Sequence, residues 1–162
     1  MVEERGGWFV VNVKDAQWRT HPHFGHGCNF EMNGRFEQTG INLRVLAPGQ
    51  PACRYHREEA QEDFLVLSGR CKLLVNGEER ELGAWDFVHC PPGVTHVFVG
   101  AGNGPCAILM VGRRPAELLH YPRCELARQY GAEAPEATDD PRVAYSDVAP
   151  PEPLDRPVWP LD

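Results

Sequence analysis

The strongest constraint on the fold of this chain is a series of short apolar runs, each as long as one β-strand. Between the runs lie turn signals rich in Gly, Pro and Asn. The sharpest is Asn76-Gly77, because both central residues of a type I′ hairpin turn need positive φ. Strands joined by turns, with no helical period between them, predict an antiparallel all-β barrel or sandwich. The predicted strands cover residues 8–13, 41–46, 64–67, 71–75, 85–90, 94–99 and 106–111.

The pattern changes after Arg114. Residues 115–120 and 122–130 predict two short helices, because each has Pro in its first turn and Gly131 follows the second. The remaining residues are rich in prolines and acidic side chains, which favour an extended segment packed on the barrel or on a partner subunit. Trp159 is a candidate anchor for that segment. The predicted organisation is a β-barrel domain over residues 1–114, a helical segment over 115–131 and a Pro-rich acidic tail over 132–162.

Charge and hydropathy limit the partners of the chain. A length of 162 residues is enough for one core, and a formal net charge of −7 argues against a nucleic-acid partner, which needs a basic face. The sequence has no apolar stretch of about 18 residues, so we expect no membrane partner. The first residues lack the features of a secretory signal, and we expect a cytoplasmic protein. The 6 cysteines form no C-x-x-C pair, so we expect free thiols that pack as small hydrophobic residues.

Two histidines and two glutamates are placed to meet inside the predicted barrel. Residues two apart in a strand face the same side, so His56 and Glu58 point inward together. A short turn then brings Glu62 to the start of the next strand, and a Pro-Gly turn delivers His96 at the start of another. Two carboxylates neutralise a divalent ion, and two imidazoles add nitrogen donors while leaving positions open. We therefore predict one divalent metal ion, which is zinc, iron, manganese or nickel, bound by His56, Glu58, Glu62 and His96.

These residues resemble the two motifs of the cupin superfamily. His56, Glu58 and Glu62 stand between Gly49 and Gly69 with the spacing of the first motif. His96 follows a Pro-x-Gly turn as in the second motif. Three departures occur: Glu58 replaces the second histidine of His-x-His, Gly100 replaces the usual Asn, and both glycine spacings are slightly longer. The resemblance covers about residues 40–112 and implies a cupin-like double-stranded β-helix, or jelly-roll, with a two-His-two-Glu metal site.

Other residues are candidates for a ligand pocket. Arg44 lies in a strand flanking the barrel, where it either clamps an acidic substrate or faces outward as an ordinary edge residue. Tyr55, Phe64 and Phe98 either line a substrate pocket or simply pack the barrel. A second group, His21, His23, His26 and Cys28, has the composition of a zinc site, but a loop at the barrel mouth is the favoured interpretation.

Two functions are compatible with this sequence. The resemblance implies a metal-dependent enzyme on a small polar molecule, of the dioxygenase, isomerase or decarboxylase type. The alternative is a non-catalytic module that binds a metal or small ligand as a sensor or carrier. In either case we expect a small-molecule ligand, and a homodimer in which β edges pair.

Overall fold

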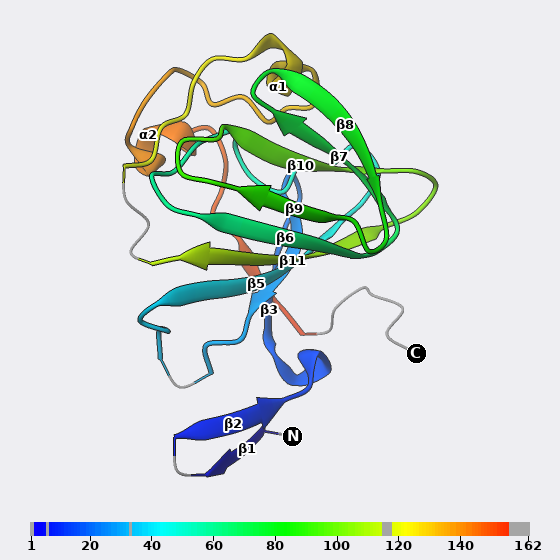
Figure 1. Cartoon of the computed structure of the whole chain (residues 1–162), viewed down its shortest axis with the longest axis vertical. Helices are drawn as coiled ribbons and strands as arrows, with labels where there is room; N and C mark the ends of the chain where they lie inside the picture. The colour runs from blue at the N-terminus through cyan, green and yellow to red at the C-terminus, as the bar shows by residue number, and fades with distance from the viewer. Residues whose placement is uncertain (1, 6, 33, 115–117, 156–162) are drawn as a thin grey trace.

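The computed structural model describes residues 2–5, 7–32, 34–114 and 118–155 of the chain (Figure 1). Within these residues the regular structure is mostly antiparallel β-strand. The elements, in chain order, are β1 (Val2–Arg5), β2 (Trp8–Val11), a 3₁₀ turn (Val13–Asp15), β3 (Gln17–His21), β4 (Gly25–Asn29), β5 (Thr39–Leu46), β6 (Glu62–Ser68), β7 (Arg70–Val75), β8 (Glu78–Gly83), β9 (Phe87–Cys90), β10 (His96–Ala101), β11 (Cys106–Arg113), α1 (Glu125–Gln129), α2 (Pro141–Ala144) and β12 (Glu152–Leu154).

The strands form a jelly-roll. The large sheet has the order β12-β3-β4-β5-β11-β6-β9, and the small sheet has the order β10-β7-β8. Strands that are distant in the sequence, such as β5 and β11, are neighbours, as a double-stranded β-helix requires. The β1–β2 hairpin extends away from the barrel at the lower end of Figure 1. The all-β cupin-like fold predicted from the sequence is therefore confirmed.

Alternate residues of facing strands fill the barrel interior. On β11, Ile108 lies opposite Val66 of β6 and Arg44 of β5, so these three side chains share the inner face of the large sheet. The same alternation places Phe64 inside and carries Glu62, at the start of β6, to the inner face. The buried residues of this core are Leu46, Ala52, Phe64, Val66, Cys71, Leu73, Cys90, Phe98, Cys106 and Ile108. All six cysteines of the chain are free, as expected, and three of them belong to this core.

Arg54 fastens the C-terminal segment to the barrel. Its buried guanidinium donates hydrogen bonds to the backbone carbonyl oxygens of Gly131, Glu133 and Ala144. It also forms an ion pair with Asp147, at 2.6 Å. Further along, β12 extends the large sheet by pairing with β3. The tail was predicted as an extended segment from its proline-rich composition. Its described residues also form two short elements, α2 and β12, which that composition did not predict.

The predicted helices need correction. The helix predicted over 122–130 is shorter and spans only Glu125–Gln129, with Gly131 at φ 69° just after its end. Residues 118–120 of the other predicted helix are not helical, because the backbone of His120 pairs with Arg57 instead. Residues 115–117 and Trp159 lie outside the described residues. None of the helices among the described residues is long and apolar enough to cross a membrane.

Candidate metal centre

His56 lies in the connection between β5 and β6 and is held against the first residue of β10. Its amide donates to the carbonyl oxygen of His96 at 3.2 Å, and the amide of His96 donates back to the carbonyl oxygen of His56 at 2.8 Å. This isolated β-bridge joins the two predicted motifs across the barrel mouth. The amide of Gly93 also donates to the carbonyl oxygen of Glu58, at 2.8 Å. The turn before β10 is therefore fixed to the segment that carries His56.

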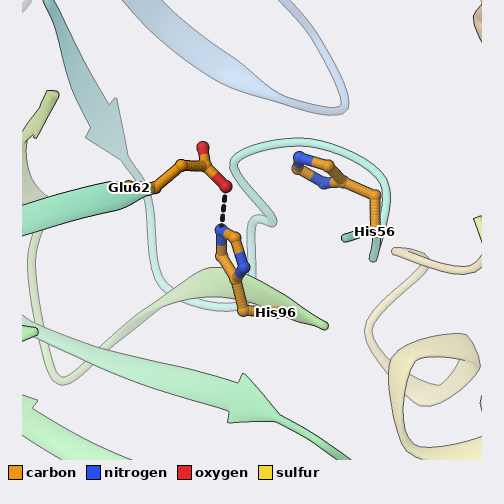
Figure 2. Close-up of side chains that lie close together, drawn as sticks. All are labelled: His56, Glu62 and His96. Carbon is orange, nitrogen blue, oxygen red and sulfur yellow. Dashed lines mark ion pairs between the residues drawn. The ribbon is translucent and has the colours of Figure 1, made fainter. Parts of the chain in front are cut away.

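Glu62 completes the group from the opposite sheet. It begins β6, and its neighbour across the ladder on β11 is Gly112. A Cβ at Gly112 would make only an ordinary van der Waals contact with the Glu62 side chain, at 3.8 Å. One ligand atom from each of His56, Glu62 and His96 lies within 4.8 Å of the other two (Figure 2). Within the described residues, these three form the one group of His, Cys, Asp or Glu side chains with metal-site geometry.

Both histidines present the same nitrogen to the centre. Nδ1 of His56 lies 2.8 Å from the carbonyl oxygen of Arg54, and Nδ1 of His96 lies 3.0 Å from that of Val94. A carbonyl oxygen only accepts, so each Nδ1 carries a proton, and Nε2 is the nitrogen that has the lone pair whenever the ring is neutral. Nε2 of His96 lies 3.3 Å from a carboxylate oxygen of Glu62, the contact drawn in Figure 2. Backbone carbonyls thus set the tautomer that metal ligation requires.

Glu58 lies beside this group. One of its carboxylate oxygens is 3.5 Å from Nε2 of His56, and its side chain is 15% exposed. Its charge acts on both neighbours: it adds to the raised pKa of Glu62, and it partly offsets the lowering of the pKa of His96. The sequence-predicted set of four is therefore gathered in one place, with Glu58 outside the tight group of three.

The electrostatics of the centre are those of a site that accepts a cation. Burial raises the pKa of Glu62 to about 7, and the Glu58 carboxylate adds to this rise while His56 opposes it. Burial, together with the charge of His56, lowers the pKa of His96 to about 4. Burial also disfavours the charged form of His56, but the Cys53 thiol and the two carboxylates outweigh it and raise its pKa well above the ordinary value. A bound cation would stabilise the ionised carboxylate of Glu62, which burial disfavours.

Aromatic side chains form the walls of the centre. Phe64 lies edge-on to His96, with ring centroids 5.1 Å apart, and Phe98 packs behind it, 4.7 Å from Phe64. Tyr121 lies 5.7 Å from His56. Both phenylalanines belong to the buried core below the centre. These contacts limit how far the two imidazole rings can turn.

The remaining predicted pocket residues are placed differently. Tyr55 packs in a cluster with Leu74 and Val97 that is separate from the barrel core, and its hydroxyl accepts a hydrogen bond from the amide of Gly77. The structure therefore does not bring Tyr55 to the metal centre. Arg44 lies on the inner face of β5, facing a cavity rather than the core.

The histidines of the second cluster do not converge. Nε2 of His21 lies 2.8 Å from the carbonyl oxygen of Ala149, while Nε2 of His23 lies 2.6 Å from that of Gly131. His26 instead contacts Thr20. Their nitrogens are engaged in separate contacts, two of which fasten the C-terminal segment to β3 and the turn after it. The structure therefore does not gather them as a zinc site. It also corrects the loop interpretation, because His21 ends β3 and both His26 and Cys28 lie on β4, so only His23 is in a turn.

Two residues at the centre were missed by sequence reasoning. Arg54 supplies the carbonyl oxygen that orients His56, and Tyr121 contacts the same ring from a segment that was predicted to separate two helices. Neither belongs to a motif. The available signal for Arg54 is weak: it is a charged residue two positions before a candidate ligand.

Comparison with known proteins identifies one domain within the chain. A family model described as the cupin domain matches residues 42–112. No curated protein matches the sequence. A sugar phosphate isomerase of the cupin superfamily from Silicibacter pomeroyi is similar, with 24% identity and a TM-score of 0.57 over 65% of this chain and 75% of that chain.

Two other solved structures share the fold to different extents. The polyketide cyclase RemF from Streptomyces resistomycificus has 19% identity and a TM-score of 0.56 over 67% of this chain and 82% of that chain. A proposed sugar phosphate isomerase from Acidithiobacillus ferrooxidans has 25% identity and a TM-score of 0.49. The matched region covers 56% of this chain and 60% of that chain. The match to the family model, together with the jelly-roll topology, shows that residues 42–112 form a cupin domain.

Proposed function

We propose that His56, Glu62 and His96 bind one divalent metal ion, with Glu58 as a fourth ligand. We further propose that the protein is a metal-dependent enzyme acting on a small polar molecule. The observation that carries the proposal is the convergence of one ligand atom from each of His56, Glu62 and His96 within 4.8 Å, with each Nδ1 facing a backbone carbonyl oxygen. Donors of nitrogen and oxygen, without thiolate, suit zinc, iron(II), manganese(II) or nickel(II). When bound, the ion would act as a Lewis acid or an oxygen-activating centre for a substrate that chelates its open positions.

The residues of the chain have distinct roles in this proposal. The carbonyl oxygens of Arg54 and Val94 hold both imidazoles in the ligating tautomer before any ion arrives. Glu62 and Glu58 supply the negative charge that balances a divalent ion. Phe64 and Phe98 keep the inner side of the centre free of water, because they are almost fully buried. Substrate would therefore approach from the barrel mouth.

The reaction itself is open between dioxygenation, isomerisation and decarboxylation. The solved structures that share the fold include an isomerase and a cyclase, so this architecture serves different reactions. Oxygen-uptake measurements of the iron(II)- or manganese(II)-loaded protein against small acids and phenols test the first class. Metal-dependent binding of these compounds without any turnover would favour the sensor or carrier function instead.

Metal content tests the site directly. Protein purified without an affinity tag should contain close to one equivalent of metal by mass spectrometry, and Glu62→Gln and His96→Ala should lose it. Matched controls are Glu81→Gln and His89→Ala, which alter exposed side chains on β8 and β9 and should keep the metal. Glu58→Gln reports on the fourth ligand. If freshly purified wild-type protein contains no metal and takes up none when a divalent metal is added, the proposal is wrong.

We also propose a homodimer. The strand β9 is an edge of the large sheet. Its first residue, Phe87, is 64% exposed, and Trp85, just before the strand, is 74% exposed. An open edge with exposed aromatic residues is stabilised by pairing with a second copy. Light scattering at micromolar concentration should give twice the chain mass, and Phe87→Lys should give the monomer mass. A monomer for the wild type would contradict this.

A further inference from the structure

Arg44 occupies an unusual position at the middle of the large sheet. It lies opposite Ile108 on β11 and opposite Gly27 on β4, with its side chain on the inner face. A Cβ at Gly27 would lie 2.9 Å from Nη1 and 3.2 Å from Cζ of Arg44. The guanidinium therefore rests directly on the β4 backbone, in space that a glycine leaves open. This contact directs the side chain across the sheet toward β3 and β4.

The guanidinium of Arg44 has no partner in the part of the chain that the structure describes. No hydrogen bond or ion pair of a described residue involves it. Its neighbours are different: Arg19 donates to the carbonyl oxygen of Pro151 at 2.6 Å, and Arg142 pairs with Asp140 at 2.8 Å. A half-buried cation without a counter-charge is costly to maintain. Its five donors are available to a ligand.

Two adjoining pockets open on this guanidinium. One, of about 140 Å³, lies over β3, β4 and β5 and is lined by the amide side chains of Gln17, Asn29 and Asn42. The other, of about 410 Å³, lies between the segment before His56 and the C-terminal segment, and contains the apolar surfaces of Phe24 and Tyr145. Arg44 lines both. Among the described residues, no Asp or Glu lines either pocket, although the chain carries a net charge of −7.

We infer that these pockets bind a small organic anion, a carboxylate or a phosphate ester, with Arg44 as the anchor of the charged group. The planar fork of guanidinium fits both oxyanions with two parallel hydrogen bonds. Amide side chains on one side accommodate polar groups, and the aromatic wall on the other accommodates an apolar body. The larger pocket also reaches Cys53, whose thiol lies 3.7 Å from Nδ1 of His56. Cys53 thus lies between this pocket and the Nδ1 side of the His56 ring.

The binding of an anion stands independently of the metal. Only the further step, that the anion is the substrate, rests on the proposed function. The test therefore uses protein freed of metal with EDTA, and includes Glu62→Gln as a variant that should lose metal yet keep anion binding. Loss of anion binding in metal-free protein would contradict the anion pocket alone, and absence of metal binding would contradict the metal site alone.

Ligand-observed NMR titrations provide the measurement. The probes are benzoate, phenyl phosphate and, as a neutral analogue, benzamide. Wild-type protein should bind at least one anionic probe about tenfold or more tightly than benzamide. Binding of benzoate alone assigns a carboxylate ligand, and binding of phenyl phosphate alone assigns a phosphate ester.

The variants connect binding to the anchor. Arg44→Gln should weaken the anionic probe about tenfold or more, and Arg44→Lys should recover only part of this because it keeps charge but loses the fork. Gly27→Ala should weaken it without changing any charge, because the new methyl displaces the guanidinium. The control is Arg70→Gln, an equal charge change at a 64% exposed side chain. Circular dichroism confirms folding. No binding of any anion to wild type, or equal loss in Arg44→Gln and Arg70→Gln, overturns the inference.

Discussion

Replacing Glu62 by Gln should stabilise the metal-free protein at alkaline pH while it abolishes metal binding. The pKa of Glu62 is raised from an ordinary 4.5 to about 7, chiefly by burial. Between these two pH values the folded protein holds a proton on this carboxyl group that the unfolded chain has released. The free energy of unfolding therefore falls as pH rises through this window, and all of the loss is present above pH 7. Gln has the shape of the protonated acid and does not ionise, so it removes this loss.

The expected size follows from the shift. Each pKa unit corresponds to about 1.4 kcal/mol, and a shift from 4.5 to about 7 gives about 3 kcal/mol. The side chain is only 16% exposed, so solvent screening reduces this value little. At pH 8 the Gln variant should therefore be about 3 kcal/mol more stable than the wild type. At pH 4.5 and below, the two proteins should be equal.

Urea denaturation of EDTA-treated protein at several pH values between 4.5 and 8 measures the difference. Glu81→Gln, whose side chain is 67% exposed, should change stability by less than about 0.5 kcal/mol at every pH. A constant difference between wild type and Glu62→Gln across the pH range would show that the carboxyl group titrates normally. Destabilisation by Gln at pH 8 would show that the ionised carboxylate is held by protein partners, which refutes the reasoning that the centre awaits a cation.

Three further predictions concern the metal and the fold. Because protons compete for Glu62, calorimetry should find manganese(II) bound about tenfold more weakly at pH 6 than at pH 8, and a pH-independent affinity would contradict this. Gly100→Ala should lower the free energy of unfolding in urea by about 3 kcal/mol or more, since a Cβ there would lie 2.1 Å from the carbonyl oxygen of Ala47. The control is Gly104→Ala, whose Cβ would have no atom within 4 Å, and it should be nearly neutral. Equal effects of the two substitutions would refute the steric argument. Arg54→Met should cost about 3–5 kcal/mol and accelerate hydrogen exchange in α2, whereas unchanged exchange there would show that the C-terminal segment is held by other contacts.

Strands that carry a short apolar run in the sequence were predictable. The runs at 41–46, 71–75 and 106–111 overlap β5, β7 and β11 closely, and Asn76, at φ 48°, forms the predicted turn before β8. The prediction rests on local signals, namely strand-length apolar runs and turn residues with positive φ, and the structure satisfies both.

Strands stabilised by their neighbours were not predictable. β4 has the sequence Gly-His-Gly-Cys-Asn, which lacks any strand preference and forms because it is paired on both sides, with β3 and β5. β8 begins with the charged residues Glu-Glu-Arg-Glu, which have no strand preference. It forms an edge strand because it pairs with β7, and ion pairs such as Lys72–Glu79 and Arg70–Glu81 join the two strands. In both cases tertiary pairing decides the conformation.

The same distinction separates the candidate metal centre from the proposed anion pocket. The tautomers of His56 and His96 are each set by a carbonyl oxygen two residues earlier in the chain, so the orientation of both rings at the candidate metal centre depends on local segments. Spacing alone was therefore enough to name those residues. The environment of Arg44 depends instead on Gly27, which leaves room for its guanidinium, and on a C-terminal segment that walls the larger pocket. Because no local pattern encodes those contacts, the sequence leaves the inward and outward orientations of Arg44 equally open, and only the β-ladder registers decide between them.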